Sequence, residues 1–397
     1  MTSTVEVPPA LRGVADRVTP LDLAKITMPG TDRACSGAES LANARGYARR
    51  VGVTRLADVT MLDRIGIPTF QAIRPQASTL TVSQGKGLTR TLASVSALME
   101  SIELWHAENF PVAGVFLDTV RGIGDSLGYD VDRDLPLEYN SLFHDDLPIE
   151  WVTATRLTDG AHVPVPYRLV VLDFREPHGW RARLFQETSN GLASGNTFVE
   201  ATLHALYEVI ERDAVSRAHR AGTAGRAFDP RLLGSAPVDS LLDRFAAAEV
   251  SVDVRWLPSP TGLPCVAARI VSPDYQILSG GYGCHLATEI ATTRALTEAA
   301  QSRLTLISGG RDDLHRGQYR PVYRMLDPVK DAPPGPESIR GQVATAHRTL
   351  LDDLAEVQRR ATAAFSAPLL VDMSQPEVGA CVAKVLVPGA QLSEGVA

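Results

Sequence analysis

Hydrophobic positions recur at helical spacing in several segments of the chain. In the longest, which runs from Thr197 to about residue 214, Leu206, Val209 and Ile210 form one apolar side, because residues three and four apart share a helix face. We expect Thr197 to be the N-cap, and Glu200 stands three residues later, the spacing of a capping box. Similar patterns predict helices over residues 33–50, 89–106, 215–250, 288–306 and 340–365.

Alternation of apolar and polar residues predicts strands between these helices. Three runs fall within residues 53–84 and are separated by turn signals at Gly66, Pro68 and Pro75. The region 110–190 is predicted to be rich in strands, at residues 150–157, 162–172 and 182–189. The remaining predicted strands cover residues 252–257, 264–271, 275–281, 368–374 and 381–389.

A glycine-containing turn is predicted before three of the helices, and two of these units share a motif. The motif and its copy are separated by 108 residues at every position: Gly87-x-Thr89 with Glu100-x-x-Glu103, and Gly195-x-Thr197 with Glu208-x-x-Glu211. A third turn, residues 280–283, leads into helix 288–306. The repetition predicts an internal duplication of one strand–turn–helix unit.

Acidic residues occupy one stripe on each of these helices. On the longest helix, one face carries Glu200, His204, Glu208 and Glu211, which lie at offsets of 0, 4, 8 and 11 residues. A solvated helix face often has such a composition, because glutamate is a good helix former. Similarly, Arg294 and Glu298 have the spacing of an ordinary surface ion pair.

The alternative is that the three helices point their acidic stripes at one place. Two carboxylates 4 Å apart repel by roughly 4 kcal/mol at an effective dielectric constant near 20, so such a cluster requires cations. Hard oxygen ligands favour Mg²⁺ or Ca²⁺. The bases among the acidic residues suit a polyphosphate: Lys86, Arg212, Arg294 and Arg303.

Composition excludes several classes of function. The 397 residues carry a net charge of −7 without a basic run, which argues against nucleic acid as a partner. The chain is 44% hydrophobic, yet no apolar run is long enough to span a membrane or form a signal peptide. The four cysteines are scattered, so we expect free thiols and a cytoplasmic protein. Cys284, beside His285, is a weak candidate nucleophile.

Two further classes of protein are compatible with the motifs of the sequence. The sequence contains neither a Walker A motif, nor a kinase signature, nor a dinucleotide fingerprint. A di-iron carboxylate bundle needs two Glu-x-x-His pairs, of which Glu103 and His106 supply one. A non-catalytic binding protein is the other alternative.

Three stretches of the chain strongly resemble the YcaO family. They are SQGKGLTRTLASVSALMESIE, SNGLASGNTFVEATLHALYEVIERDA and GYGCHLATEIATTRALTEAAQSR, in the family's order. The resemblance implies an α+β fold, with helices on mixed, largely antiparallel sheets, and commonly a homodimer. It also implies binding of ATP and Mg²⁺, and activation of a peptide backbone amide by phosphorylation of its oxygen.

The resemblance assigns roles to individual residues. It implies Mg²⁺ ligands at Glu100, Glu103, Glu208, Glu211 and Glu298. It implies nucleotide contacts at Arg33, Ser40, Lys86, Ser96, Asn190, Glu200, Arg212 and Arg294. The general base is unknown, with His106 and His204 as candidates.

Two departures from the family pattern bear on the product. Leu104 stands where the first helix usually has arginine, and residues 102–108 look more like the branch that works with a TfuA partner and makes thioamides. The C-terminus lacks the Pro-x-Pro-x-Pro ending of azoline-forming members. We therefore expect sulfur insertion, as thioamide or thiazoline, with macroamidine formation as the alternative and a partner protein that only binds nucleotide as a third.

The predicted organisation is one catalytic domain with short ends. Residues 1–30 are expected to be a flexible lead-in, 31–390 the YcaO domain, and 391–397 a tail, with residues 308–340 a mobile loop inside the domain. The lead-in is too short for a leader-binding domain. We expect a precursor peptide as substrate and a separate TfuA-like or leader-binding protein as partner.

Overall fold

The computed structural model describes residues 11, 24–175, 182–314, 316–320 and 347–393. All strand pairings in these residues are antiparallel, in agreement with the largely antiparallel sheets that were expected. The largest sheet runs in the order β6 (Phe116–Asp118), β7 (Ile149–Arg156), β14 (Leu369–Asp372), β15 (Cys381–Leu386) and β9 (Leu192–Gly195), with β8 (His162–Pro166) on β7.

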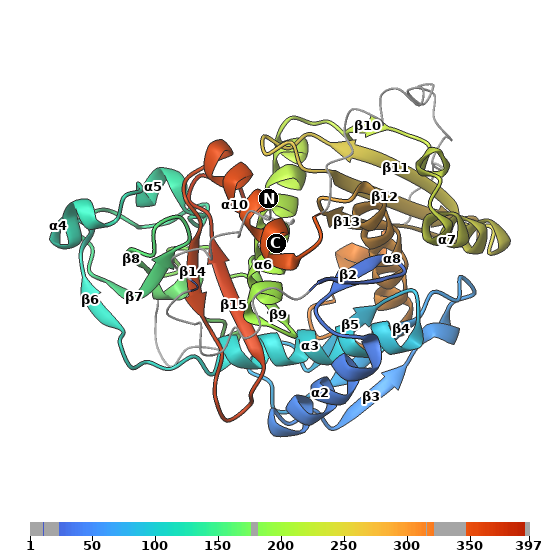
Figure 1. The fold of residues 1–397 in the computed structure, drawn as a ribbon, viewed down its shortest axis with the longest axis horizontal. Coiled ribbons are helices and arrows are strands. Elements are labelled where there is room, and N and C mark those ends of the chain that lie inside the picture. Colours follow the sequence, from blue (N-terminus) through green and yellow to red (C-terminus); the bar gives the residue numbers. More distant parts are fainter. Residues whose placement is uncertain (1–10, 12–23, 176–181, 315, 321–346, 394–397) are drawn as a thin grey trace.

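Two smaller sheets lie on the other side of the molecule (Figure 1). One contains β10 (Arg226–Ala227), β11 (Ser251–Leu257), β12 (Cys265–Ser272) and β13 (Tyr275–Cys284). The other contains β3 (Arg55–Asp58), β4 (Thr69–Ile73) and β5 (Val82–Lys86). A hairpin is formed by β1 (Ile26–Met28) and β2 (Thr31–Arg33).

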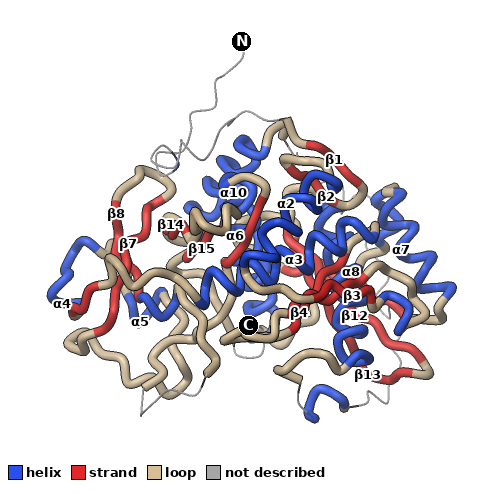
Figure 2. Tube along the Cα trace, turned by 90° about the horizontal axis from the view of Figure 1, so that it is seen from below, coloured by secondary structure: helices blue, strands red, loops and turns tan. Residues whose placement is uncertain are grey.

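Helices surround and separate the sheets (Figure 2). The long ones are α2 (Gly37–Arg50), α3 (Arg90–Glu108), α6 (Phe198–Arg220), α7 (Ala236–Ala247), α8 (Thr288–Ser308) and α10 (Leu350–Ala364), and α4 (Val120–Ile123) and α5 (Val131–Asp134) are single turns. Among the described residues, no helix has both the length and the apolar character to cross a membrane. The helices and the sheets together form the α+β fold that was expected.

Three strand–helix units organise the centre: β5 with α3, β9 with α6, and β13 with α8. The predicted duplication is thus present in the structure, and β13–α8 is a third unit of the same kind. The predicted N-cap Thr197 is confirmed, and Thr89 occupies the same position at α3: both side chains accept hydrogen bonds from backbone N–H groups in the first turn. The apolar side of α6 is buried as predicted.

Most glycines of these units lie in strands and not in turns, and this corrects the prediction. Gly195 belongs to β9 and residues 280–283 belong to β13, whereas Gly87 directly follows β5. None of these glycines has a positive φ. A Cβ at Gly281 would lie 2.2 Å from the backbone nitrogen of Ala299 in α8. Glycine is required here because strand and helix backbones approach too closely for a side chain.

Three predicted boundaries also change. Residues 24–30 belong to the folded unit, since β1 pairs with β2 and Lys25 is buried against Asp353. Residues 182–189 form no strand, only an isolated bridge at Phe185. At the other end, residues 391–393 are anchored, because Asp213 accepts from the N–H of Gln391. Residues 321–346 of the predicted mobile loop lie outside the described residues.

We predict that Gly281→Ala destabilises the protein by about 1–3 kcal/mol or more, because the added methyl group must displace the backbone of α8. Gly46→Ala is the control. Gly46 lies in α2 with open space around its Cβ position, and alanine is the better helix former. Chemical denaturation of both variants is the measurement. Equal stability of the two variants would contradict the close contact.

Candidate functional site

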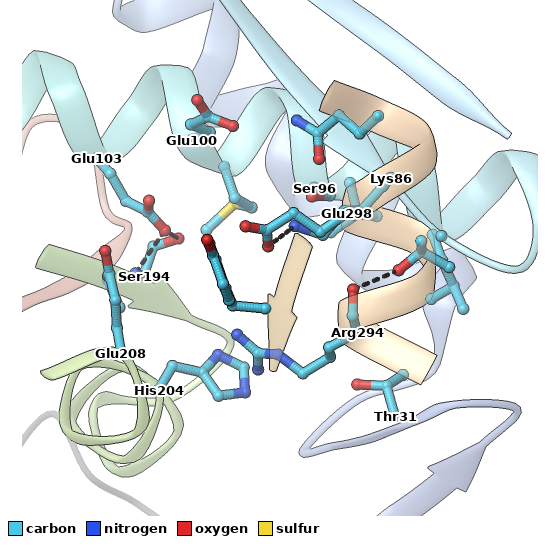
Figure 3. A pocket seen from close by; sticks show the side chains of 18 of the residues that line it. Thr31, Lys86, Ser96, Glu100, Glu103, Ser194, His204, Glu208, Arg294 and Glu298 are labelled. Carbon is cyan, nitrogen blue, oxygen red and sulfur yellow. Dashed lines mark hydrogen bonds and ion pairs between the residues drawn. The ribbon is translucent and has the colours of Figure 1, made fainter. Parts of the chain in front are cut away.

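One cavity of about 950 Å³ lies where the three strand–helix units meet. Side chains from α3, α6 and α8 point into it from different sides (Figure 3). The residues predicted to bind nucleotide or Mg²⁺ line this cavity, with the exceptions of Asn190 and Arg303. The helix stripes are therefore buried together, and the interpretation of them as solvated surfaces is wrong.

Glu103 is held by a strand of another unit. The backbone N–H and the hydroxyl of Ser194 donate to its Oε1 at 2.7 and 2.6 Å (Figure 3). These hydrogen bonds favour the charged carboxylate, but burial outweighs them and raises the pKa of Glu103 to about 8. Burial also raises the pKa values of Glu100 and Glu208 to about 7, so these groups share the cavity only with protons or cations present.

Glu298 differs from the other carboxylates because it has a direct partner. The ammonium group of Lys86 donates to its Oε2 at 2.6 Å. Burial would raise the pKa of Glu298, but Lys86 and Arg212 outweigh burial and lower it. Glu211, buried nearby, has its pKa raised by burial and by the charge of Glu298. The pair Arg294–Glu298 is thus not a surface pair: both side chains face the cavity.

A second polar network links the hairpin β1–β2 to α6. Oε2 of Glu200 accepts from the backbone N–H of Ala34 at 2.9 Å, and the side chain of Asn196 donates to both carboxylate oxygens. Arg33 lies 3.5 Å from Glu200 through its Nε. The predicted capping box is therefore half formed: Thr197 caps α6, but the Glu200 carboxylate faces the site.

His204 supports Arg33. Its Nε2 accepts from Nη1 of Arg33 at 2.9 Å. Burial, and the charges of Arg33 and Arg294, lower the pKa of His204 well below its usual value. The imidazole is consequently neutral, and the lone pair on its Nε2 accepts the hydrogen bond from the Arg33 guanidinium group.

The donor set fits a cation and a polyanion, although no metal cluster is preformed. Within the described residues, no three acidic, histidine or cysteine side chains lie close enough together to hold an ion as they stand. The carboxylates supply the hard oxygen ligands that Mg²⁺ prefers. In addition, the buried hydroxyl groups of Ser279 and Thr293 at the cavity wall have no partner among the described residues, which leaves polar groups available to a ligand.

Two predicted site residues lie elsewhere. Asn190 does not line the cavity, and the neighbouring position is taken by Ser189. His106 is fully buried outside the cavity, in the last turn of α3, where its Nδ1 contacts the carbonyl oxygen of Ile102 at 2.7 Å. A role for His106 as general base is therefore wrong, because the cavity reaches only the earlier turns of α3.

Two further expectations about single residues fail. Arg303 is buried against Asp63, with 2.9 Å between Nε and Oδ2, and it follows Arg294 by nine residues, which places it on the opposite face of α8. Cys284 is buried away from the cavity opposite Cys265, and burial raises the pKa of its thiol well above the usual value. It is not a nucleophile for this site.

The structure adds three residues that the patterns did not indicate as site residues. Ser194 holds Glu103, and Asn196 connects Glu200 with Ser40, whose hydroxyl donates to Asn196 at 2.9 Å. Arg311 reaches the cavity from the segment after α8, and its charge acts on Glu100. Ser194 and Asn196 flank the motif glycine, a signal that the sequence did contain. For Arg311 the sequence held no such signal.

The fold and the cavity define an α+β protein with an internally repeated unit and a buried site of carboxylates and guanidinium groups. Residues 84–391 match the model of the family described as YcaO cyclodehydratase, ATP- and Mg²⁺-binding. The chain belongs to the YcaO family.

Relatives cover most of the chain. It is 36% identical over 369 residues to an uncharacterized protein of Mycobacterium tuberculosis, covering 92% of this chain and 83% of that protein. It is 36% identical to an uncharacterized protein of Methanothermobacter thermautotrophicus, with 86% and 90% covered. An uncharacterized protein in the tfuA 3′ region of Rhizobium leguminosarum bv. trifolii is 33% identical, with 91% and 89% covered.

Solved structures share the fold. The YcaO protein from Methanopyrus kandleri bound with AMPPCP and Mg²⁺ superposes with a TM-score of 0.69 at 24% identity, covering 93% of this chain and 94% of that one. A heterocyclase in complex with substrate and cofactor gives a TM-score of 0.73 at 20% identity, covering 97% of this chain and 56% of the heterocyclase.

We predict that the protein without ligands loses stability as the pH rises. The pKa of Glu103 is about 8 in the folded protein against an ordinary 4.5, so stability from its protonated form is full below pH 4.5 and is lost as the pH rises through about 8. Glu103→Gln keeps an oxygen acceptor for Ser194 and should raise the melting temperature at pH 8 but not at pH 4.

Glu377→Gln, at an exposed position, serves as the control and should leave both melting temperatures unchanged. A Glu103→Gln gain of equal size at the two pH values would show that ionisation of Glu103 is not the cause.

Proposed function

We propose that this protein uses ATP and Mg²⁺ to phosphorylate the oxygen of a peptide backbone amide, in the biosynthesis of a ribosomally made, modified peptide. The observation that carries the proposal is the burial of carboxylates from three separate helices in one cavity, with Lys86, Arg212 and Arg294 among them. The family description as ATP- and Mg²⁺-binding, and the nucleotide analogue and Mg²⁺ in the Methanopyrus kandleri structure, support it.

The cavity residues divide into two sets. The Mg²⁺ ligands would be Glu100, Glu103, Glu208 and Glu211, with Glu298 beside them. The nucleotide would be held by Arg33, Ser40, Lys86, Ser96, Glu200, Arg212 and Arg294. Bound Mg²⁺ supplies compensation for the negative charge of the transferring phosphoryl group. The chain's own task is to position the peptide and nucleotide and to exclude water.

Phosphorylation solves a chemical problem of the substrate. A backbone amide is a poor electrophile because resonance stabilises it. Attack by a nucleophile gives a tetrahedral oxyanion, which reverts unless its oxygen can leave. Once the oxygen carries a phosphoryl group it leaves as phosphate, and the nucleophile stays bonded to carbon. Lys86 and Arg212 are cations of the cavity that can stabilise the departing phosphate.

We favour attack by sulfur on the activated amide, which gives a thioamide or a thiazoline as the product. The relative in a tfuA 3′ region supports the branch with a TfuA partner, and residues 102–108 of α3 resemble that branch. Macroamidine formation by an N-terminal amine is the second candidate. A nucleotide-binding protein that only regulates a partner is the third. We further propose a homodimer, a precursor peptide as substrate, and a cytoplasmic location.

We assign His204 to positioning rather than to proton transfer. Its Nε2 lone pair is occupied by Arg33, so it cannot accept a substrate proton without releasing that guanidinium group. By fixing Arg33 beside Glu200, it keeps a positive charge at the wall of the nucleotide site.

Glu208→Gln should lower peptide-dependent ATP consumption by roughly 100-fold or more, because it removes a Mg²⁺ ligand from the cavity. The same change should abolish the Mg²⁺-dependent part of ATP binding, measured by calorimetry. Glu377→Gln is the matched control at the surface. If Glu208→Gln consumed ATP at the wild-type rate, Glu208 would not be a Mg²⁺ ligand.

Mass spectrometry of precursor peptides encoded nearby, after incubation with ATP and a sulfide source, should separate the products. Exchange of oxygen for sulfur raises the peptide mass by the difference between the two atoms. Ring closure removes one water, and tandem fragmentation then distinguishes an azoline from a macrocycle. An unchanged peptide together with intact ATP would favour the regulatory protein.

A further inference from the structure

An open groove of about 490 Å³ lies outside the site, between α2, the edge strand β3 and the first turns of α3. Its floor is apolar and includes Leu41, Ala48, Val53, Leu56 and Leu98. Four arginines surround it: Arg45, Arg49, Arg55 and Arg90. All four are exposed. Figure 1 shows α2 and β3 along the lower edge of the molecule.

Three of these arginines lack a compensating charge. Arg90 pairs with Asp58. The side chains of Arg45, Arg49 and Arg55 form neither a hydrogen bond nor an ion pair with any described residue. Exposed arginines elsewhere, such as Arg121 and Arg133, pair with nearby aspartates. A cluster of unpaired positive side chains in a chain of net charge −7 indicates a binding site for an anionic ligand.

Helix stability explains only one of the three arginines. Arg49 lies in the last turn of α2, where a cation complements the helix dipole. Arg45 lies in the middle of α2, and Arg55 belongs to β3. Their convergence on one groove therefore has no explanation within the described chain.

The shape of the groove selects an extended peptide. Strand β3 is at the edge of its sheet, because the strand order is β3-β4-β5. An edge strand presents unpaired backbone groups to which another segment can add. Its four residues correspond to about 13 Å of extended chain at roughly 3.3 Å per residue, and residues 53–56 line the groove.

We propose that this groove binds an acidic, extended segment of the substrate peptide, which adds to the edge of β3 and places carboxylates against Arg45, Arg49 and Arg55. The inference rests on the proposed function. Its link to the site is α2: Ser40 and Asn43 line the cavity, whereas Arg45 and Arg49 line the groove. A helix is about 10–12 Å across, so one peptide can occupy both.

Direct binding tests the proposal without turnover. The probe is a fluorescein-labelled peptide of eight residues that alternates glutamate with leucine, and its partner probe carries lysine in place of glutamate. By fluorescence anisotropy, the acidic probe should bind and the basic probe should not. Added salt should weaken the binding, since exposed charges are screened.

The variant is the triple substitution Arg45→Glu, Arg49→Glu and Arg55→Glu, which should weaken binding of the acidic probe by about tenfold or more. Arg226→Glu is the matched control, because Arg226 is an exposed arginine on the edge strand β10 of another sheet. It should bind the probe like the wild type. Arg226→Glu should melt like the wild type, whereas the triple variant should melt slightly lower, because Arg49→Glu places a negative charge at the C-terminal end of α2.

Hydrogen exchange locates the bound probe. Amides of residues 53–58 should become protected when the acidic probe is added, as expected for strand addition, whereas residues of β10 should not. Failure of the acidic probe to bind, unchanged binding by the triple variant, or an equal loss in Arg226→Glu would each overturn the proposal. These results are independent of ATP consumption, so a failure of the proposed function would be seen separately.

Discussion

Burial of like charges is the constraint on which the centre of this protein depends. Removing carboxylates from water raises their pKa values, as it does for Glu100, Glu103 and Glu208. The protein offsets this cost with cations drawn from separate elements, such as Lys86 from β5 and Arg212 from α6. The offset is incomplete, and a site that stays short of positive charge is suited to bind a divalent cation.

The close approach of strands to helices creates the geometry in which these charges meet. Strand glycines lie against helix alanines that are fully buried, such as Ala97 and Ala299. With small residues on both sides, each helix packs tightly on its own strand, and its long acidic side chains project from the adjacent side of the helix. Three such units then surround one cavity, and the acidic residues become neighbours although they lie up to 198 residues apart in sequence.

The periodicity of the sequence predicted local features of the structure correctly. It failed for features that depend on how distant segments pack together. The long helices, their caps and their acidic stripes follow from spacing, and the duplicated motif indicated a common site. Spacing does not show where a cavity ends along a helix, so His106 was wrongly included three residues after Glu103. Glycine likewise signals a turn or a close approach with equal strength, and only the packing of α8 on Gly281 distinguishes the two.

Within the cavity, carboxylates and guanidinium groups are partly separated. Glu100, Glu103 and Glu208 lie on one side, and Arg294 lies on the other beside His204 (Figure 3). A nucleotide and its cation have opposite requirements, because phosphate oxygens need donors and a cation needs carboxylates. The pair Lys86–Glu298 lies between the two sides, where cation and polyanion have to meet.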